Sequence, residues 1–403
     1  MFIKIQADML RVGMYVVDVE SPLLKHDLLF SLKGHLHTEN EIELIHKSGF
    51  LEAYIDLNKS MPGSVPAELI PLDFLALEGE ENKDYTPPPP TVPLAEEMQK
   101  ARTIYSSSIS FARTMFDGLQ SGDFTPELAL PVVDDILDSL DRNSSALFGL
   151  CKLRQTDEYT YTHCVNVSVL AVTFARGLGV PQQIQRQIGL GGLFHDLGKR
   201  FVPTAILNAP RKLTLAEFDL MKKHPLYGKK ILDNIPNIPE ATIQAVVEHH
   251  EKADGSGYPF GLNQGQISLV GKISCIVDIF DALSSKRVYK DAMPLHKVLS
   301  ILYSMRESAF QPHLLDRFIN LIGVFPLGSA VQLKDGRRGV VSGLNHNDSL
   351  RPKVILVQNE KKAPVPREEI DLANEQSCIA KAISSTELGV DPVRVLGIPT
   401  GSK

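Results

Sequence analysis

Residues 191–199 read GGLFHDLGK, and the His195-Asp196 doublet within this stretch lies at the centre of a longer pattern. Histidines and carboxylates recur in order on both sides of it: His163, His195, Asp196, His224, His249, His250 and Asp278. Imidazole and carboxylate groups are the ligands that hold Zn, Mn or Fe in proteins. Five of the 12 histidines lie between residues 163 and 250, a concentration that a solvated surface does not require. The pattern therefore predicts a metal site.

Helical phase supports this prediction. His163 extends an apolar stripe that includes Val167 and Leu170, and His250 falls on the stripe of Val246 and Ile243. These histidines are therefore expected to point inward. An ionisable group there is costly unless another group or a cation satisfies it.

Composition and charge exclude several other classes of protein. The 403 residues are enough for two or three domains, and 43% hydrophobic with 22% charged residues is an ordinary globular profile. A net charge of −6 gives no general reason to expect a nucleic-acid polymer or a basic membrane patch as partner. The four cysteines form no CxxC pair, and neither a signal peptide nor a membrane span is evident. We expect a cytoplasmic protein.

The chain reads as a mainly α multidomain protein with a small α/β module at its N-terminus and a small β appendage near its C-terminus. A Thr38/Glu41 capping box marks a helix in the first module, prolines 87–90 mark a linker, and Asp335-Gly336 is a hairpin signal. The expected segments are an α/β module (1–58), a Pro-rich linker (59–93), a long connecting helix (94–126), a helical domain (127–325), a β appendage (326–375) and a flexible tail (376–403).

The connecting helix carries a heptad seam, which leaves two interpretations open. The seam is formed by Leu94, Met98, Ala101, Tyr105, Ser108, Ala112, Met115 and Leu119. It could pair two chains in a homodimer through residues 94–119, or it could pack on its own domain. Bulky residues off the seam, such as Ile104 and Phe111, favour packing within the chain.

The ligand set indicates the chemistry. The two carboxylate oxygens of Asp196 can contact two cations, with a group of histidines for each. Two metal ions about 3.5–4 Å apart can share a hydroxide and clamp a phosphate for in-line displacement. Ligation by nitrogen and oxygen without thiolate favours Fe or Mn over a structural Zn site. The sequence therefore predicts two divalent ions and phosphoester hydrolysis.

Cations near these ligands indicate an anionic substrate. Lys199 lies three residues after Asp196, and Arg287 and Lys290 follow Asp278. The glycine-rich loop between His250 and Asp278 can approach a ligand closely, and its Tyr258 could stack on a base or lend a hydroxyl.

Together these segments resemble the HD-GYP family of the HD phosphohydrolase superfamily. The resemblance covers roughly residues 140–325 and rests on HCVNVS (163–168), GGLFHDLGK (191–199), HPLYG (224–228), EHHEKADGSGYP (248–259) and DIFDALSSKRVYK (278–290). Both signatures that name the family are present and in order. The resemblance implies an HD-type helical bundle that hydrolyses cyclic di-GMP to linear pGpG, and often onward to GMP.

The resemblance also assigns roles to residues. It places His163, His195, Asp196 and Asp278 around one metal, and Asp196, His224, His249 and His250 around the other. It places Lys199, Asp281, Arg287 and Lys290 where the family handles phosphates and guanines. Asp196 and Lys199 would be the catalytic residues, and Tyr258 would wall the site.

Further implications concern the metal count and the flanking regions. Some members bind a third metal through a Glu four residues before the first His; that position is Tyr159 here, so we expect a binuclear site. The N-terminal module and the β appendage resemble common family extensions, and the HD-GYP surface could bind partner proteins. Two alternatives stay open: another nucleotide phosphohydrolase of the HD superfamily, and a catalytically silent sensor that binds cyclic di-GMP.

Overall fold

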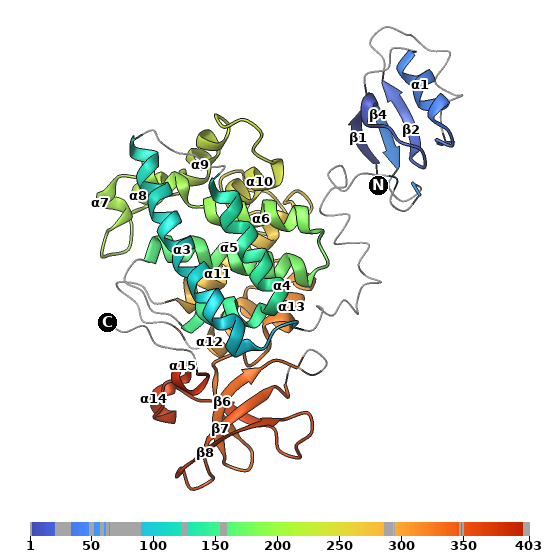
Figure 1. Cartoon of the computed structure of the whole chain (residues 1–403). Helices are drawn as coiled ribbons and strands as arrows, with labels where there is room; N and C mark the ends of the chain where they lie inside the picture. Colours follow the sequence, from blue (N-terminus) through green and yellow to red (C-terminus); the bar gives the residue numbers. More distant parts are fainter. Residues whose placement is uncertain are drawn as a thin grey trace. The chain divides into compact units, whose positions relative to one another are not determined.

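The computed structural model divides the chain into two units, Met1–Asp84 and Tyr85–Lys403 (Figure 1). The structure describes residues 2–20, 34–47, 52–56, 60–61, 64, 90–121, 128–153, 159–285, 293, 295–345, 348 and 350–397. Among these residues, no helix is both long and apolar enough to cross a bilayer.

In its described residues, the first unit is a four-stranded antiparallel sheet with one α-helix. The sheet order is β1-β4-β2-β3, with bounds β1 Phe2–Gln6, β2 Tyr15–Glu20, β3 Gly34–His35 and β4 Glu52–Asp56. Helix α1 spans Glu39–Lys47, and its buried Ile42 and Ile45 pack with Val16 and Ile55 of the strands. The Glu41 carboxylate accepts a hydrogen bond from the Thr38 backbone N–H at the start of this helix (3.0 Å).

The second unit is mostly helical, which confirms the predicted fold class. Its helices are α3 Leu94–Ser121, α4 Ala129–Leu153, α5 Tyr159–Gly177, α6 Gln182–Phe194, η6 Leu197–Phe201, α7 Thr204–Leu207, α8 Leu215–Met221, α9 His224–Leu232, α10 Glu240–Glu248, α11 Leu269–Ser284, α12 Leu295–Ser304 and α13 Pro312–Ile322. Helices α5, α6, α10 and α11 pack on one another. His163 and Asp278 lie on α5 and α11, and His195 and His249 directly follow α6 and α10.

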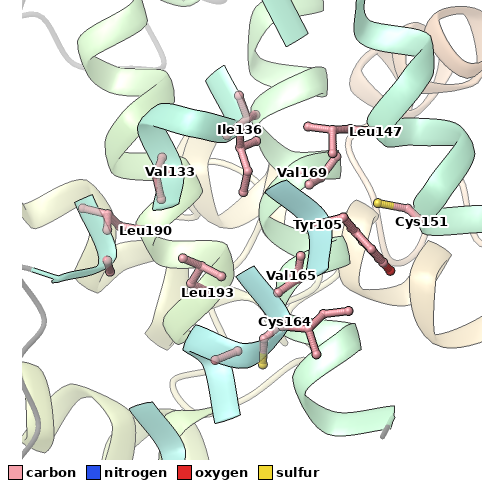
Figure 2. Close-up of a cluster of buried hydrophobic side chains, with 14 of the residues drawn as sticks. Tyr105, Val133, Ile136, Leu147, Cys151, Cys164, Val165, Val169, Leu190 and Leu193 are labelled. Carbon is pink, nitrogen blue, oxygen red and sulfur yellow. The ribbon is translucent and has the colours of Figure 1, made fainter. Parts of the chain in front are cut away.

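Helix α3 belongs to the core of this unit. Its seam residues Met98, Ala101, Tyr105, Ala112 and Met115 are buried in one apolar cluster together with side chains of α4, α5 and α6. Figure 2 shows Tyr105 among these apolar side chains. Packing within the chain is therefore the correct interpretation of the heptad seam. The other interpretation, a homodimer paired through residues 94–119, gains no support from this structure, because most of the seam is already covered.

A five-stranded antiparallel sheet follows the helices, in the order β8-β7-β6-β5-β9. Its strands are β5 Ala330–Leu333, β6 Arg338–Gly343, β7 Lys353–Gln358, β8 Pro364–Asp371 and β9 Ile379–Ala382. Two short helices, α14 Ser385–Leu388 and α15 Pro392–Val395, complete the described chain.

The prediction of a flexible tail over residues 376–403 is wrong for its described part. Strand β9 pairs with β5, with Val331 opposite Ala382 and Leu333 opposite Ile379. The buried Arg338 side chain contacts the Glu387 carboxylate of α14 (3.1 Å). Leu396, just after α15, packs against both the sheet and the helical cluster. The apolar residues of segment 376–397 are too few and too widely spaced to form a periodic signal. This segment is therefore recognised only by its pairing with residues far away in the sequence.

Candidate metal centre

The His195-Asp196 doublet lies where α6 ends and the 3₁₀ helix η6 begins. His195 keeps helical dihedral angles (φ −53°, ψ −35°), whereas Asp196 leaves them (φ −100°, ψ 4°). Glycines allow the neighbouring helices to approach this corner. A Cβ at Gly192 would lie 2.6 Å from the Ser168 Cα, and a Cβ at Gly198 would lie 1.9 Å from the His224 carbonyl oxygen. The glycines of GGLFHDLGK therefore bring α5 and α9 against the doublet.

Backbone carbonyls orient three of the histidine rings in the same way. The Nδ1 atoms of His195, His224 and His249 each lie 2.7–2.9 Å from the carbonyl oxygen three residues earlier in the chain. A carbonyl only accepts, so each Nδ1 must carry the proton and donate it. The Nε2 lone pairs are then left for another partner, which is the usual arrangement of metal-binding histidines.

The ligand atoms gather in two neighbouring groups, and a third set, formed by His195, Asp196 and His249, links them. Within each group they lie within 4.8 Å of one another, and the groups are His163, His195 and Asp278, and His224, His249 and His250. In the first group, His163 Nε2 lies 3.3 Å from His195 Nε2 and 3.0 Å from Asp278 Oδ1. In the second, His224 Nε2 lies 3.1 Å from His249 Nε2.

Asp196 lies between the two groups and turns one oxygen toward each. Its Oδ2 lies 3.3 Å from His195 Nε2, and its Oδ1 lies 3.5 Å from His224 Nε2. Within the described residues, no donor forms a hydrogen bond to the buried Oδ1. A buried carboxylate oxygen without a donor is costly, and a cation would satisfy it.

The protonation states suit metal binding in the second group. Burial, followed by the Lys199 ammonium, lowers the pKa of His224 to about 3. Burial likewise lowers the pKa of His250 to about 4 and that of His249 well below its usual value. These imidazoles are therefore neutral near pH 7, which is the form that binds metals.

His163 behaves differently. Burial alone would lower its pKa, but the carboxylates of Asp278 and Asp281 outweigh burial and raise the pKa to about 9. The same surroundings hold the pKa of Asp278 well below its usual range, since His163 opposes the effect of burial. His163 therefore carries a proton near pH 7, and a metal ion bound here would take the place of that proton. The His and Asp clusters fit divalent metals in donor type, charge and spacing.

Lys199 lies beside the candidate bridge, as predicted. Its Nζ donates to Asp196 Oδ2 at 2.6 Å, and its side chain keeps 26% of its surface exposed. Burial would lower the pKa of Lys199, but Asp196 and Asp278 raise it, so the side chain is an ammonium. The Lys199 ammonium therefore contacts the buried Asp196 carboxylate and is also partly exposed to solvent.

The assignment of Asp281 to substrate binding is wrong. This residue is fully buried, and its Oδ2 accepts from His163 Nδ1 at 2.8 Å. Its Oδ1 accepts from the Asn166 amide (3.0 Å) and from the Ser285 hydroxyl (3.0 Å). Asp281 therefore fixes the ring of His163 from behind.

The GYP loop forms a wall beside the second group. The Tyr258 ring lies against the His250 ring, with centroids 4.6 Å apart. The buried Glu251 carboxylate accepts from the backbone N–H groups of Phe260 (2.7 Å) and Leu262 (2.9 Å) and so holds the loop. Sequence reasoning assigned no role to Glu251 or Asn166, although Asn166 follows His163 by three residues and so shares its helix face.

Three further positions cannot be placed. Arg287 and Lys290 lie outside the described residues, and so does the side chain of Tyr159.

Three family models match the chain. A domain of unknown function (DUF3391) matches residues 2–124, an HD domain matches residues 138–314, and a KOW domain associated with HD domains matches residues 330–390. The HD model includes all of the predicted metal ligands.

The chain is also similar to named proteins. It is 32% identical over 371 residues to cyclic di-GMP phosphodiesterase PA4108 of Pseudomonas aeruginosa, covering 92% of this chain and 88% of that protein. It is 39% identical over 155 residues to 3'3'-cGAMP-specific phosphodiesterase 3 of Vibrio cholerae, covering 38% of this chain and 33% of that protein. The solved structure of Bd1817, an HDG"Y"P protein from Bdellovibrio bacteriovorus, matches 79% of this chain and 98% of that chain, with 17% identity and a TM-score of 0.48.

Proposed function

This chain belongs to the HD-GYP family of cyclic di-GMP phosphodiesterases, and we propose that it hydrolyses cyclic di-GMP at the centre around Asp196. The observation that carries the proposal is the Asp196 carboxylate. It is buried, it turns one oxygen toward each group of histidines, and no described donor bonds to Oδ1.

This geometry supports two ligand sets. We propose that His163, His195, Asp196 and Asp278 hold one divalent ion, and that Asp196, His224, His249 and His250 hold the other. Ligation by nitrogen and oxygen favours Fe or Mn. When bound, such a pair of ions activates water and neutralises charge on a phosphate held between them.

The residues of the chain supply the remaining functions. Asp281 and the backbone carbonyls orient the imidazoles, and Asp196 fixes the spacing of the two groups. The Lys199 ammonium is exposed enough to meet a non-bridging phosphate oxygen and to offset the negative charge that develops there. Tyr258 packs along His250 and offers its ring to a base of the substrate.

The reaction balances as a hydrolysis. The oxygen of a water molecule forms a new bond to phosphorus, and the bond from phosphorus to the 3′ oxygen breaks. One proton of the water ends on that 3′ oxygen. The first product is linear pGpG, and a second hydrolysis of the same kind would give GMP.

The test is product chromatography with a panel of cyclic di-GMP, 3'3'-cGAMP, pGpG and dNTPs. We expect cyclic di-GMP to be converted to pGpG by the metal-loaded protein. Preferential turnover of dNTPs would favour another HD-superfamily hydrolase, and binding of cyclic di-GMP without product would favour a sensor. Preferential turnover of 3'3'-cGAMP would keep the chemistry but overturn the substrate.

We also propose a cellular compartment from the state of the cysteines. All four cysteines are free thiols, and three of them are buried. Unpaired cysteines are typical of reducing compartments, and we therefore place the protein in the cytoplasm. Cell fractionation with an antibody against the chain would test this.

A further inference from the structure

Helix α3 reaches the metal centre through a line of buried hydrogen bonds. The Tyr105 hydroxyl on α3 donates to Asn166 Oδ1 on α5 at 2.6 Å. The Asn166 amide nitrogen donates to Asp281 Oδ1 on α11 at 3.0 Å, and Asp281 Oδ2 accepts from His163 Nδ1 at 2.8 Å. His163 then turns Nε2 toward Asp278, 3.0 Å away.

The direction of every bond in this line is fixed by chemistry. The Asp281 carboxylate can only accept, so the amide nitrogen of Asn166 must face it. The amide oxygen of Asn166 then faces Tyr105, whose hydroxyl must be the donor. Tyr105, Asn166 and Asp281 are all at most 1% exposed, so water does not compete for these bonds. In such surroundings, neighbouring hydrogen bonds strengthen one another.

We propose that Tyr105 is a positioning residue for the metal centre, acting through Asn166 and Asp281 on the ring of His163. The Tyr105 hydroxyl holds the Asn166 amide in one orientation, and that orientation holds Asp281 against His163 Nδ1. Without the hydroxyl, the Asn166 amide oxygen loses its donor, so the amide is held less firmly and its bond to Asp281 loosens. His163 then loses part of the support that sets the direction of Nε2.

With Tyr105, the functional unit extends beyond the residues that the HD model matches. The HD model begins at residue 138, whereas Tyr105 lies in the region matched by the domain of unknown function, residues 2–124. Helix α3 therefore contributes to the apolar cluster and also supplies the Tyr105 hydroxyl, which helps to orient His163. The inference rests on the proposed metal site.

The experiment compares two hydroxyl deletions on the same helix, both in the full chain. Tyr105→Phe removes only the hydroxyl of the line. Ser108→Ala removes a buried hydroxyl that bonds to the Ile104 carbonyl of its own helix (2.8 Å). Mn²⁺ is titrated into chelator-treated protein, and free Mn²⁺ is followed by electron paramagnetic resonance. Thermal unfolding shows whether each variant is folded.

We expect Tyr105→Phe to bind Mn²⁺ about tenfold more weakly, the lower end of the effect for partners of metal-binding histidines. Saturating Mn²⁺ should restore the wild-type turnover. Ser108→Ala should bind Mn²⁺ as the wild type does. In an Asn166→Ala background, Tyr105→Phe should have no further effect, because the line is already cut.

Three outcomes would overturn the inference: unchanged Mn²⁺ affinity in Tyr105→Phe, the same loss in Ser108→Ala, or losses for Tyr105→Phe and Asn166→Ala that multiply. Failure of the proposed function itself would be recognised by a result on the wild-type protein. In that case the wild-type protein would bind neither Mn²⁺ nor, under argon, Fe²⁺.

Discussion

Replacement of Lys199 by Met separates catalysis from metal binding. Methionine keeps the length of the aliphatic stem, so little packing is lost, but it removes the ammonium that lies 2.6 Å from Asp196 Oδ2. Both oxygens of Asp196 stay available to cations. We therefore expect the metal content to be unchanged.

The expected effect on rate follows from the exposure of the side chain. Removing one group that stabilises developing charge costs about 10²- to 10³-fold in turnover. Because 26% of the Lys199 side chain is exposed, solvent screens part of its charge, and we expect the lower end. A loss of about 100-fold corresponds to about 2.7 kcal/mol of activation free energy.

The assay is steady-state production of pGpG, paired with metal analysis of the same sample. Lys229→Met is the matched control, because Lys229 forms an exposed ion pair with Asp233 on α9 (2.7 Å) and should leave turnover unchanged. Turnover of Lys199→Met within about threefold of the wild type would refute the role of this lysine in the reaction. Loss of metal from the variant would show that the lysine supports the site instead.

Three further predictions concern the centre. Asp196→Asn should lose both metal and turnover, because an amide offers one neutral acceptor where two anionic oxygens stood; a variant that keeps two metal ions would contradict the bridging role. Chelator-treated protein should lose about 3 kcal/mol of unfolding free energy as pH rises from about 6.5 to about 9, because folded His163 holds its proton to a pKa of about 9. Below pH 6.5 the contribution of His163 to the unfolding free energy is complete. Denaturant titrations should find this contribution reduced in Asp281→Asn, and the same pH dependence in both proteins would contradict the explanation. Tyr258→Ala should raise KM roughly fivefold or more through loss of a stacking contact worth about 1–3 kcal/mol, and an unchanged KM in steady-state assays would exclude that contact.

The sequence was sufficient to predict that these candidate ligands lie close together, because each one lies on a helix with a clear apolar face or within two residues of its end. His163 and Asp278 continue the buried faces of α5 and α11, and His195 and His249 directly follow α6 and α10. Their order and spacing matched a known signature. Convergence of the side chains then followed from packing of those four helices.

The residues that orient the ligands, such as Asp281 and Tyr105, could not be predicted in the same way. Asp278 and Asp281 are three residues apart on one helix, so the sequence offers two carboxylates on one face without showing which one turns inward behind His163. Tyr105 fits the apolar seam equally well whether or not its hydroxyl forms a hydrogen bond. Only the packed structure shows that this hydroxyl meets Asn166.

The C-terminal strand illustrates a second limit. Residues 379–382 form β9 because β5 offers an unpaired edge, and that partner lies about fifty residues earlier in the chain. Local composition carries no trace of such a pairing. For the same reason, the boundary of the β appendage was placed too early.

The most direct test of the central claim is a metal count on full-length protein purified without oxygen, with cyclic di-GMP turnover followed in the same preparation. Two Fe or Mn ions per chain, accompanied by conversion of cyclic di-GMP to pGpG, are the predicted result. A folded sample that takes up neither ion after reconstitution would contradict the claim that Asp196 joins two metal sites.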